Sequence, residues 1–204
     1  FDIHELTTAQ ISAFTGKAAL KALQNEHTFN LDLLVRESIQ NSSDAAIDGD
    51  DRYRIDADEY FNVMPYAEAV GQYAMQFINA EKMPRKYKIG FSSSPKNQSH
   101  ATMRDLGFVA RPDGKFDVYS AGGIGPNPKV GVKVGEAVEP QDILKYVRAM
   151  WVMFRAYGNY ENRARARSRY MQETLGGPEK YYEAFQAKLA EVEGTDDFAF
   201  EIKE

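Results

Sequence analysis

Three short β-like runs between two helical stretches limit the fold of this chain more than any other feature. The runs are KYKIGFSSS (86–94), LGFVARPDGKFDVYSAGG (106–123) and KVGVKVGEAV (129–138), and Gly, Pro and Ser punctuate them. Such punctuated runs are typical of strands, and the Pro-Asp-Gly within the second run indicates a hairpin. The order of helices, strands and helices predicts an α+β fold with a mixed sheet covered by helices.

Apolar residues at helical spacing mark the flanking segments. We expect helices within residues 6–29, 30–46, 65–81, 139–158, 162–177 and 178–193. Pro65 and Pro178 suit the first turn of their helices, because proline needs no hydrogen-bonded N–H there. Gly176 and Gly177 are expected to end the helix that precedes Pro178.

Composition excludes several classes of protein. The chain of 204 residues has no cysteine, so it cannot by itself hold a disulfide framework, a zinc–thiolate site or an iron–sulfur cluster. Its formal net charge of -5 gives no general attraction to nucleic acid. The three histidines are widely spread, so we expect no metal site. No apolar run approaches the length of about 20 residues that crosses a bilayer, and cytoplasm is the default expectation.

One motif suggests a nucleotide site. Glu37, Asn41 and Asp44 have the spacing found on the magnesium-binding helix of gyrase-type and chaperone-type ATPases. Those enzymes also need an Asp-x-Gly-x-Gly turn that recognises adenine, and SAGGIGPNPKVG lacks the leading Asp. A short match on an amphipathic helix is weak evidence, so an ATPase using Glu37 and Asn41 is kept only as the weaker alternative.

The basic segment MPRKYKIGF (83–91) is more informative. On an extended chain Lys86 and Lys88 share one face, while Tyr87 and Ile89 share the other. Two neighbouring ammonium groups repel each other, so either water screens them or an anion lies between them.

Four motifs occur together: Pro-Arg-Lys-x-Lys (84–88), Asp-Leu-Gly-Phe (105–108), Gly-Gly-x-Gly (122–125) and the arginine-rich GNYENRARARSRY (158–170). In this combination and order the chain resembles the siroheme-dependent sulfite and nitrite reductases, specifically their cysteine-free first repeat. The resemblance implies a nitrite/sulfite-reductase-like siroheme domain over residues 59–204. Residues 1–58 would be an N-terminal helical segment, the remnant of a degraded ferredoxin-like half-domain.

The resemblance also implies a function: binding siroheme and an anionic substrate, sulfite or nitrite, for six-electron reduction. Siroheme is rich in carboxylates, so both ligands call for arginine and lysine. The residues implied at the substrate are Lys86, Lys88 and Arg36. Those implied at the cofactor are Asn159, Arg163, Arg167, Gly122, Gly123 and Gly125. Arg163 and Arg167 are expected four apart on one inward helix face, and the glycines are expected to let backbone N–H groups approach siroheme carboxylates.

Two positions depart from the family pattern. Ala9 stands where the family has an arginine that contacts the anion, and Ser94 stands where the second repeat has a cysteine. The 4Fe–4S cluster would therefore come from another repeat or chain. The partners implied are this cluster-bearing repeat or subunit and an electron donor protein. Neither nucleic acid nor membrane is expected as a partner. A non-catalytic reductase-like binding module stays open as an alternative, and sulfite and nitrite are not distinguished.

Overall fold

The structure is a computed structural model that describes residues 58–77 and 82–202. All of them belong to one compact unit that begins at Arg54. Its larger elements are α4 (Met64–Ala74), β1 (Ile89–Ser92), β2 (Leu106–Ala110), β3 (Phe116–Ser120), β4 (Val132–Val138), α5 (Ile143–Tyr157), α6 (Met171–Thr174) and α7 (Pro178–Val192). The predicted boundary between residues 58 and 59 falls at the edge of the described residues and stays a prediction.

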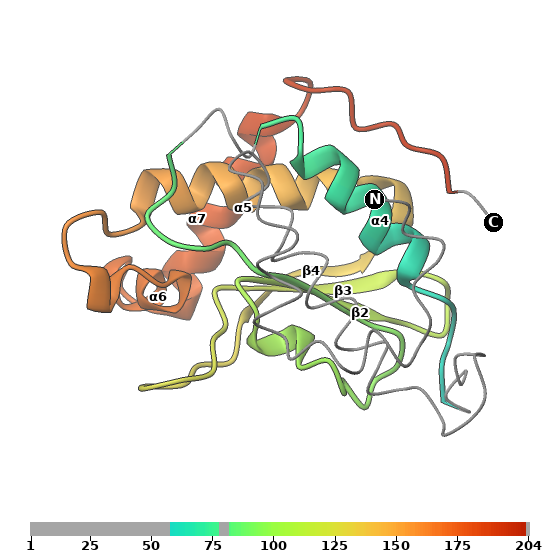
Figure 1. The fold of residues 1–204 in the computed structure, drawn as a ribbon, viewed down its shortest axis with the longest axis horizontal. Coiled ribbons are helices and arrows are strands. Elements are labelled where there is room, and N and C mark those ends of the chain that lie inside the picture. Colours follow the sequence, from blue (N-terminus) through green and yellow to red (C-terminus); the bar gives the residue numbers. More distant parts are fainter. Residues whose placement is uncertain (1–57, 78–81, 203–204) are drawn as a thin grey trace, which may run out of the picture. The chain divides into compact units, whose positions relative to one another are not determined.

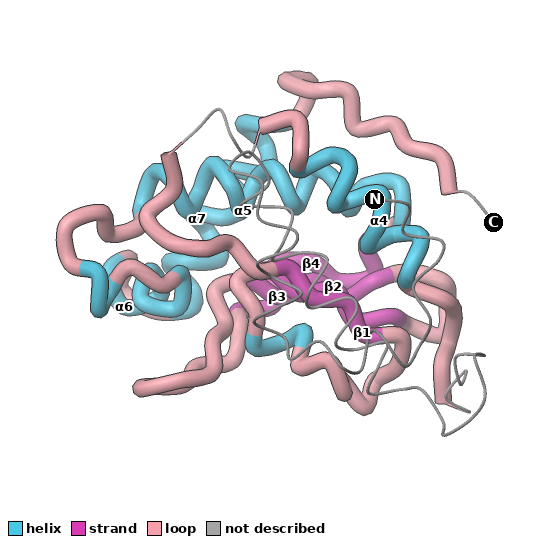
Figure 2. Tube along the Cα trace, viewed as in Figure 1, coloured by secondary structure: helices cyan, strands magenta, loops and turns pink. Residues whose placement is uncertain are grey.

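The four strands form one mixed sheet in the order β1-β2-β3-β4. β1 runs parallel to β2, while β2 with β3 and β3 with β4 are antiparallel. The turn between β2 and β3 is the predicted Pro-Asp-Gly hairpin, in which Gly114 has a φ of 79°. Glycine adopts this backbone conformation at little cost. Figures 1 and 2 show α4, α5 and α7 on one side of this sheet, which confirms the predicted α+β fold.

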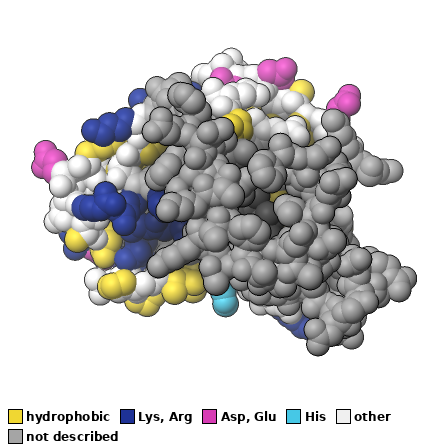
Figure 3. All heavy atoms as spheres, viewed as in Figure 1, with side chains coloured by type: hydrophobic (Ala, Val, Ile, Leu, Met, Phe, Trp, Pro, Cys, Tyr) yellow, Lys and Arg dark blue, Asp and Glu magenta, His cyan; other side chains and the backbone are white. Residues whose placement is uncertain are grey.

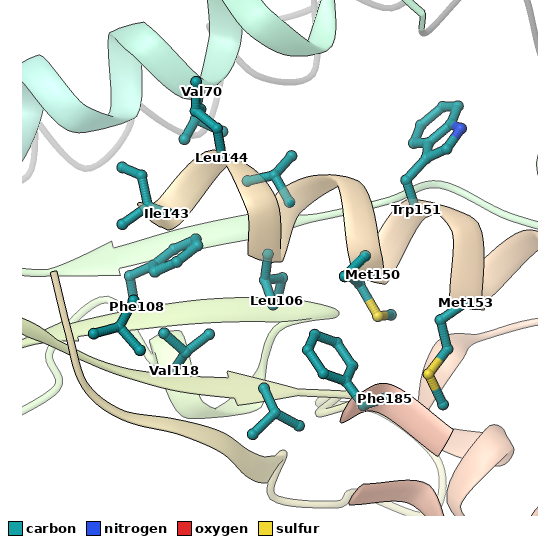
Figure 4. Close-up of a cluster of buried hydrophobic side chains, with 14 of the residues drawn as sticks. Val70, Leu106, Phe108, Val118, Ile143, Leu144, Met150, Trp151, Met153 and Phe185 are labelled. Atoms are coloured by element: carbon teal, nitrogen blue, oxygen red, sulfur yellow. The ribbon is translucent and has the colours of Figure 1, made fainter. Parts of the chain in front are cut away.

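The core lies between the sheet and these helices. Side chains from β2 and β3 point at the apolar face of α5, and Figure 4 shows Leu106, Phe108 and Val118 beneath Ile143 and Met150. The strand register explains this arrangement, because residues paired across strands share a face: Phe108 lies opposite Val118. The single tryptophan, Trp151 on α5, is only 1% exposed.

A 3-10 turn, η2 (Ala101–Met103), packs on the other face of the sheet. There the strands carry glycine: a Cβ on Gly107 would lie 1.9 Å from the Ala101 carbonyl oxygen, and one on Gly90 would lie 2.8 Å from Arg104 Cγ. The glycine of the Asp-Leu-Gly-Phe motif is therefore explained by the close approach of two backbones.

Two helix predictions need correction. α4 ends at Ala74, earlier than expected. Residues 162–177 do not form one helix; they form η4 (Arg163–Arg165), η5 (Ser168–Tyr170) and the short α6. Asn162 interrupts the pattern, because its side chain accepts a hydrogen bond from the Ala164 N–H and closes a tight turn. The predictions for 139–158 and 178–193 are confirmed by α5 and α7, the latter starting at Pro178.

None of the helices in residues 58–77 and 82–202 is long and apolar enough to span a membrane. Within the same ranges, no group of three or more His, Asp or Glu side chains is arranged to hold a metal ion.

Candidate anion-binding site

A buried carboxylate lies at the centre of the candidate site. Asp105 directly precedes β2, and its side chain is fully buried. Its Oδ2 accepts a hydrogen bond from the Lys88 backbone N–H at 2.7 Å, and its Oδ1 accepts one from the Ser168 hydroxyl. The Arg167 Nη2 lies 3.6 Å from Oδ2. Asp105 thereby joins the segment that leads into β1 to the arginine-rich segment before α6.

The electrostatics of Asp105 have two opposed causes. Burial raises the pKa of the Asp105 carboxyl above its ordinary value, because a buried charge loses its hydration. The Arg167 guanidinium, the Ser168 hydroxyl and the Lys88 N–H all favour the ionised form and lower that pKa in part. The charge of Asp105 thus depends on the basic groups around it.

The segment before β1 alternates as the sequence predicts. Tyr87 and Ile89 pack against the hydrophobic core, and the Tyr87 hydroxyl donates a hydrogen bond to the Val147 carbonyl at 3.2 Å. Lys86 is exposed and Lys88 half-buried on the opposite side of the extended chain. The aromatic residue thus fixes the backbone, while the two lysines project away from the core.

The arginine-rich segment places its side chains differently from a helix. Asn159 is exposed, and its side-chain oxygen accepts hydrogen bonds from the N–H groups of Glu161 and Asn162, which stabilises the loop after α5. Arg163 is exposed, whereas Arg167 has extended backbone angles and turns toward Asp105. The expectation that Arg163 and Arg167 share one helix face is wrong, because no helix forms there. Their roles toward a cofactor stay predictions.

The predicted glycine turn has a structural explanation. The Gly122 N–H donates to the Arg104 carbonyl at 2.8 Å, and the Gly123 N–H donates to the Lys129 carbonyl at 2.9 Å. A Cβ on Gly122 would lie 2.7 Å from backbone atoms of η2, and Gly125 has a φ of 139°. Two of the three N–H groups are therefore already bonded within the chain, and a contact of this turn with siroheme stays a prediction.

Two arginines that the sequence analysis did not select are notable. Arg169 is 5% exposed; its Nη2 donates to the Pro126 carbonyl at 2.8 Å, and its guanidinium lies over the Tyr170 ring. Its Nε is buried without a hydrogen-bond partner, as are Nε and Nη1 of Arg85. A buried guanidinium nitrogen without an acceptor is costly, so both arginines would gain from donating hydrogen bonds to an anionic ligand. Arg85 is itself the arginine of the Pro-Arg-Lys-x-Lys motif (84–88), which was the available signal for it.

Several predicted residues lie outside the described part of the chain. They are Arg36, Ala9 and the residues of the ATPase-like motif, Glu37, Asn41 and Asp44. Within the described part, the Lys88 backbone N–H and the Arg167 guanidinium meet at the Asp105 carboxylate. Figure 3 shows that Lys and Arg side chains gather on the same side of the molecule as α6 in Figure 1. Cationic side chains grouped in this way attract and orient small anions and carboxylates.

By fold and site, the described unit is an α+β domain whose cationic side suits an anionic ligand. A family model described as the nitrite and sulphite reductase 4Fe-4S domain matches residues 45–192. The chain belongs to this family.

Curated relatives include the hemoprotein beta-components of NADPH sulfite reductase from Staphylococcus haemolyticus and Nitrosomonas eutropha. The first is 31% identical over 131 residues, covering 58% of this chain and 22% of the relative. The second is 33% identical over 111 residues, covering 49% and 19%. The chain thus matches about a fifth of the length of these relatives. Among solved structures, the NirA protein of Mycobacterium tuberculosis is similar to this chain with a TM-score of 0.55 and 23% sequence identity. The match covers 67% of this chain and 25% of the NirA chain, and it supports the fold.

Proposed function

We propose that this chain is the siroheme-binding and anion-binding part of a cytoplasmic sulfite or nitrite reductase. The observation that carries the proposal is the meeting of Lys88 and Arg167 at the buried carboxylate of Asp105. Two segments that are far apart in the sequence are thereby joined at one carboxylate, Lys88 through its backbone N–H and Arg167 through its guanidinium. Family membership supports the same reading, since the described relatives are sulfite reductase hemoproteins.

The residues present fit siroheme. Arg85 has two buried guanidinium nitrogens without a hydrogen-bond acceptor, and Arg169 has one. Carboxylates on the rim of a bound macrocycle would accept those hydrogen bonds, and the planar guanidinium suits a bidentate grip. When bound, siroheme supplies the iron at which electrons reach the anion.

The lysines and Arg167 would act on the substrate. The Lys86 and Lys88 ammonium groups would hold the anion electrostatically and deliver protons from Nζ to each oxygen that leaves as water. Arg167 lies 3.6 Å from Asp105, a separation too long for a hydrogen bond, so its N–H groups would be able to donate to a bound anion. Positioned charges of this kind bind the anion and stabilise the negative charge that develops during reduction.

The 4Fe–4S cluster does not fit this chain. The sequence has no cysteine, and the soft cluster iron is held by thiolates. Ser94 is buried, with its carbonyl accepting a hydrogen bond from the Ser92 hydroxyl at 2.9 Å. We therefore propose that another repeat or subunit brings the cluster, and that an electron donor protein reduces the assembly.

A non-catalytic reductase-like binding module is the second candidate. It is favoured by the absence of cysteine from the sequence, since an iron–sulfur cluster needs thiolate ligands. The two candidates differ in whether the assembled protein reduces its anion. The ATPase alternative receives no support from the family found here.

The test is sulfite and nitrite reduction by the natural assembly that contains this chain, with Lys88→Ala and Arg167→Ala as variants. Each is expected to lower the rate by about a hundredfold, as loss of one charge-stabilising donor does in other enzymes. Lys180→Ala is the matched control, because Lys180 is exposed on α7 and pairs only with Glu183 among the described residues. Unchanged rates in both variants would refute the proposal, and an assembly without siroheme absorption or activity would establish the binding module.

A further inference from the structure

The Asp-Leu-Gly-Phe motif contributes an acidic residue to a site that is expected to bind anions. A carboxylate beside the ligand repels it, so electrostatics alone gives no reason for Asp105 to be there. Its burial also costs hydration, which is why its pKa is raised. A buried carboxylate that costs hydration and repels an anion must be retained for another reason.

The bonds of Asp105 show what that role is. Its Oδ2 fixes the Lys88 backbone, and its Oδ1 fixes Ser168, the residue directly after Arg167. Its own carbonyl accepts the Ala121 N–H at 2.9 Å, next to the glycine turn. A single residue thus joins three parts of the site that are distant in sequence.

The pairing with Arg167 is of a particular kind. The Arg167 Nη2 lies 3.6 Å from Oδ2, which is an ion pair without a hydrogen bond. The Arg167 side chain is 24% exposed, whereas that of Asp105 is fully buried. The carboxylate therefore attracts the guanidinium from beneath and leaves its donors for a ligand on the outer side.

We propose that Asp105 is a positioning residue of the anion site: its buried carboxylate holds the Lys88 backbone and the Arg167 guanidinium together, so that both side chains meet the same ligand. The proposal rests on the proposed function and names the residue that assembles that site. Partners that orient metal-binding side chains have comparable effects, since losing one weakens the metal affinity about 10–100-fold.

The test measures sulfite affinity of the purified chain by calorimetry for the wild type and Asp105→Asn. The substitution keeps the shape and removes the negative charge. A purely electrostatic role predicts tighter sulfite binding in the variant, because a repulsive charge is gone. The positioning role predicts binding about tenfold weaker, the opposite sign. Asp113→Asn is the matched control, because Asp113 lies in the exposed hairpin at the other end of β2 and should leave the affinity unchanged.

A second measurement keeps the test independent of the proposed function. The Arg167 Nε–H signal in NMR of the ligand-free chain should be that of an ordered side chain in the wild type and move to the mobile value in Asp105→Asn. If the wild type binds no sulfite but this signal moves, the proposed function fails while the positioning role stands. Should Asp105→Asn not fold, Ser168→Ala removes one carboxylate hydrogen bond and should show the same changes in weaker form. Sulfite binding equal to or tighter than wild type, or an unmoved Arg167 signal, would overturn the proposal.

Discussion

Replacing Gly107 by alanine should destabilise the protein strongly, although the change adds a single methyl group. The new Cβ would lie 1.9 Å from the carbonyl oxygen and 2.4 Å from the carbonyl carbon of Ala101. Both are backbone atoms of η2, so no side-chain rotation relieves the overlap. The same carbonyl accepts the Arg104 N–H at 3.1 Å, so moving it strains that bond as well.

The expected cost follows from this geometry. Adding a methyl group to a well-packed interior costs about 1–3 kcal/mol, and a clash with backbone places Gly107→Ala at about 3 kcal/mol or more. For a chain of this size that lowers the melting temperature by about 6–12 °C. Gly114→Ala is the control: its φ of 79° disfavours alanine by about 1 kcal/mol, but nothing lies within 4 Å of the new Cβ.

The assay is urea unfolding followed by the fluorescence of Trp151, the one tryptophan of the chain. Its ring is buried and packs against the rings of Phe77 and Tyr87. A lower midpoint at unchanged slope reports a loss of stability. Equal losses for Gly107→Ala and Gly114→Ala, or a loss below about 0.5 kcal/mol for the former, would refute the close-approach explanation.

Three further predictions concern titration and buried hydrogen bonds. Burial raises the pKa of Asp105 in the folded state. The free energy of unfolding should therefore fall as the pH rises from the ordinary pKa near 3.9 to the raised pKa. In pH-dependent denaturation, Asp105→Asn should lack this fall. Tyr181→Phe removes a buried hydrogen bond shared with a β3 serine and should cost about 1 kcal/mol, whereas Tyr182→Phe at the exposed neighbour should cost nothing measurable in urea. The Arg111 hydrogen bond lowers the pKa of Asp113, so its stabilising effect exists above the ordinary pKa and is lost as the pH falls through the lowered one. NMR titration of Arg111→Ala should show the pKa of Asp113 rising toward its ordinary value, since the Lys115 N–H still lowers it in part.

The strands and the two long helices were predictable because local signals agree there. β2 is a short apolar run, β3 alternates between buried and half-buried residues, and the Pro-Asp-Gly turn joins them. α7 begins at the expected proline. The prediction of one helix over residues 162–177 was wrong because helix propensity and hydrogen bonding disagree there. Arginine and alanine favour helix, but the Asn162 cap and the bond from Ser168 to Asp105 hold the chain in turns.

The site was predictable only in part. Lys86 and Lys88 were placed by strand alternation, which depends on neighbours in sequence. Asp105 was recognised only as the first residue of the Asp-Leu-Gly-Phe motif. Its part in the site comes from contacts with residues far along the chain, which alternation does not reveal. The inward turn of Arg169 likewise depends on Pro126, which no periodicity relates to it.

Asp105 forms hydrogen bonds with residues far from it in the sequence, and this has a consequence for folding. Its bond to Lys88 closes a loop of 17 positions, whereas its bond to Ser168 spans 63 and encloses β2, β3, β4 and α5. Longer loops close at greater entropic cost, and contacts between distant residues form late on the folding route. We therefore expect the cationic groups to converge only after the sheet and α5 have docked. A nascent or partly folded chain would therefore lack the grouping of Lys88, Arg167 and Ser168 around Asp105.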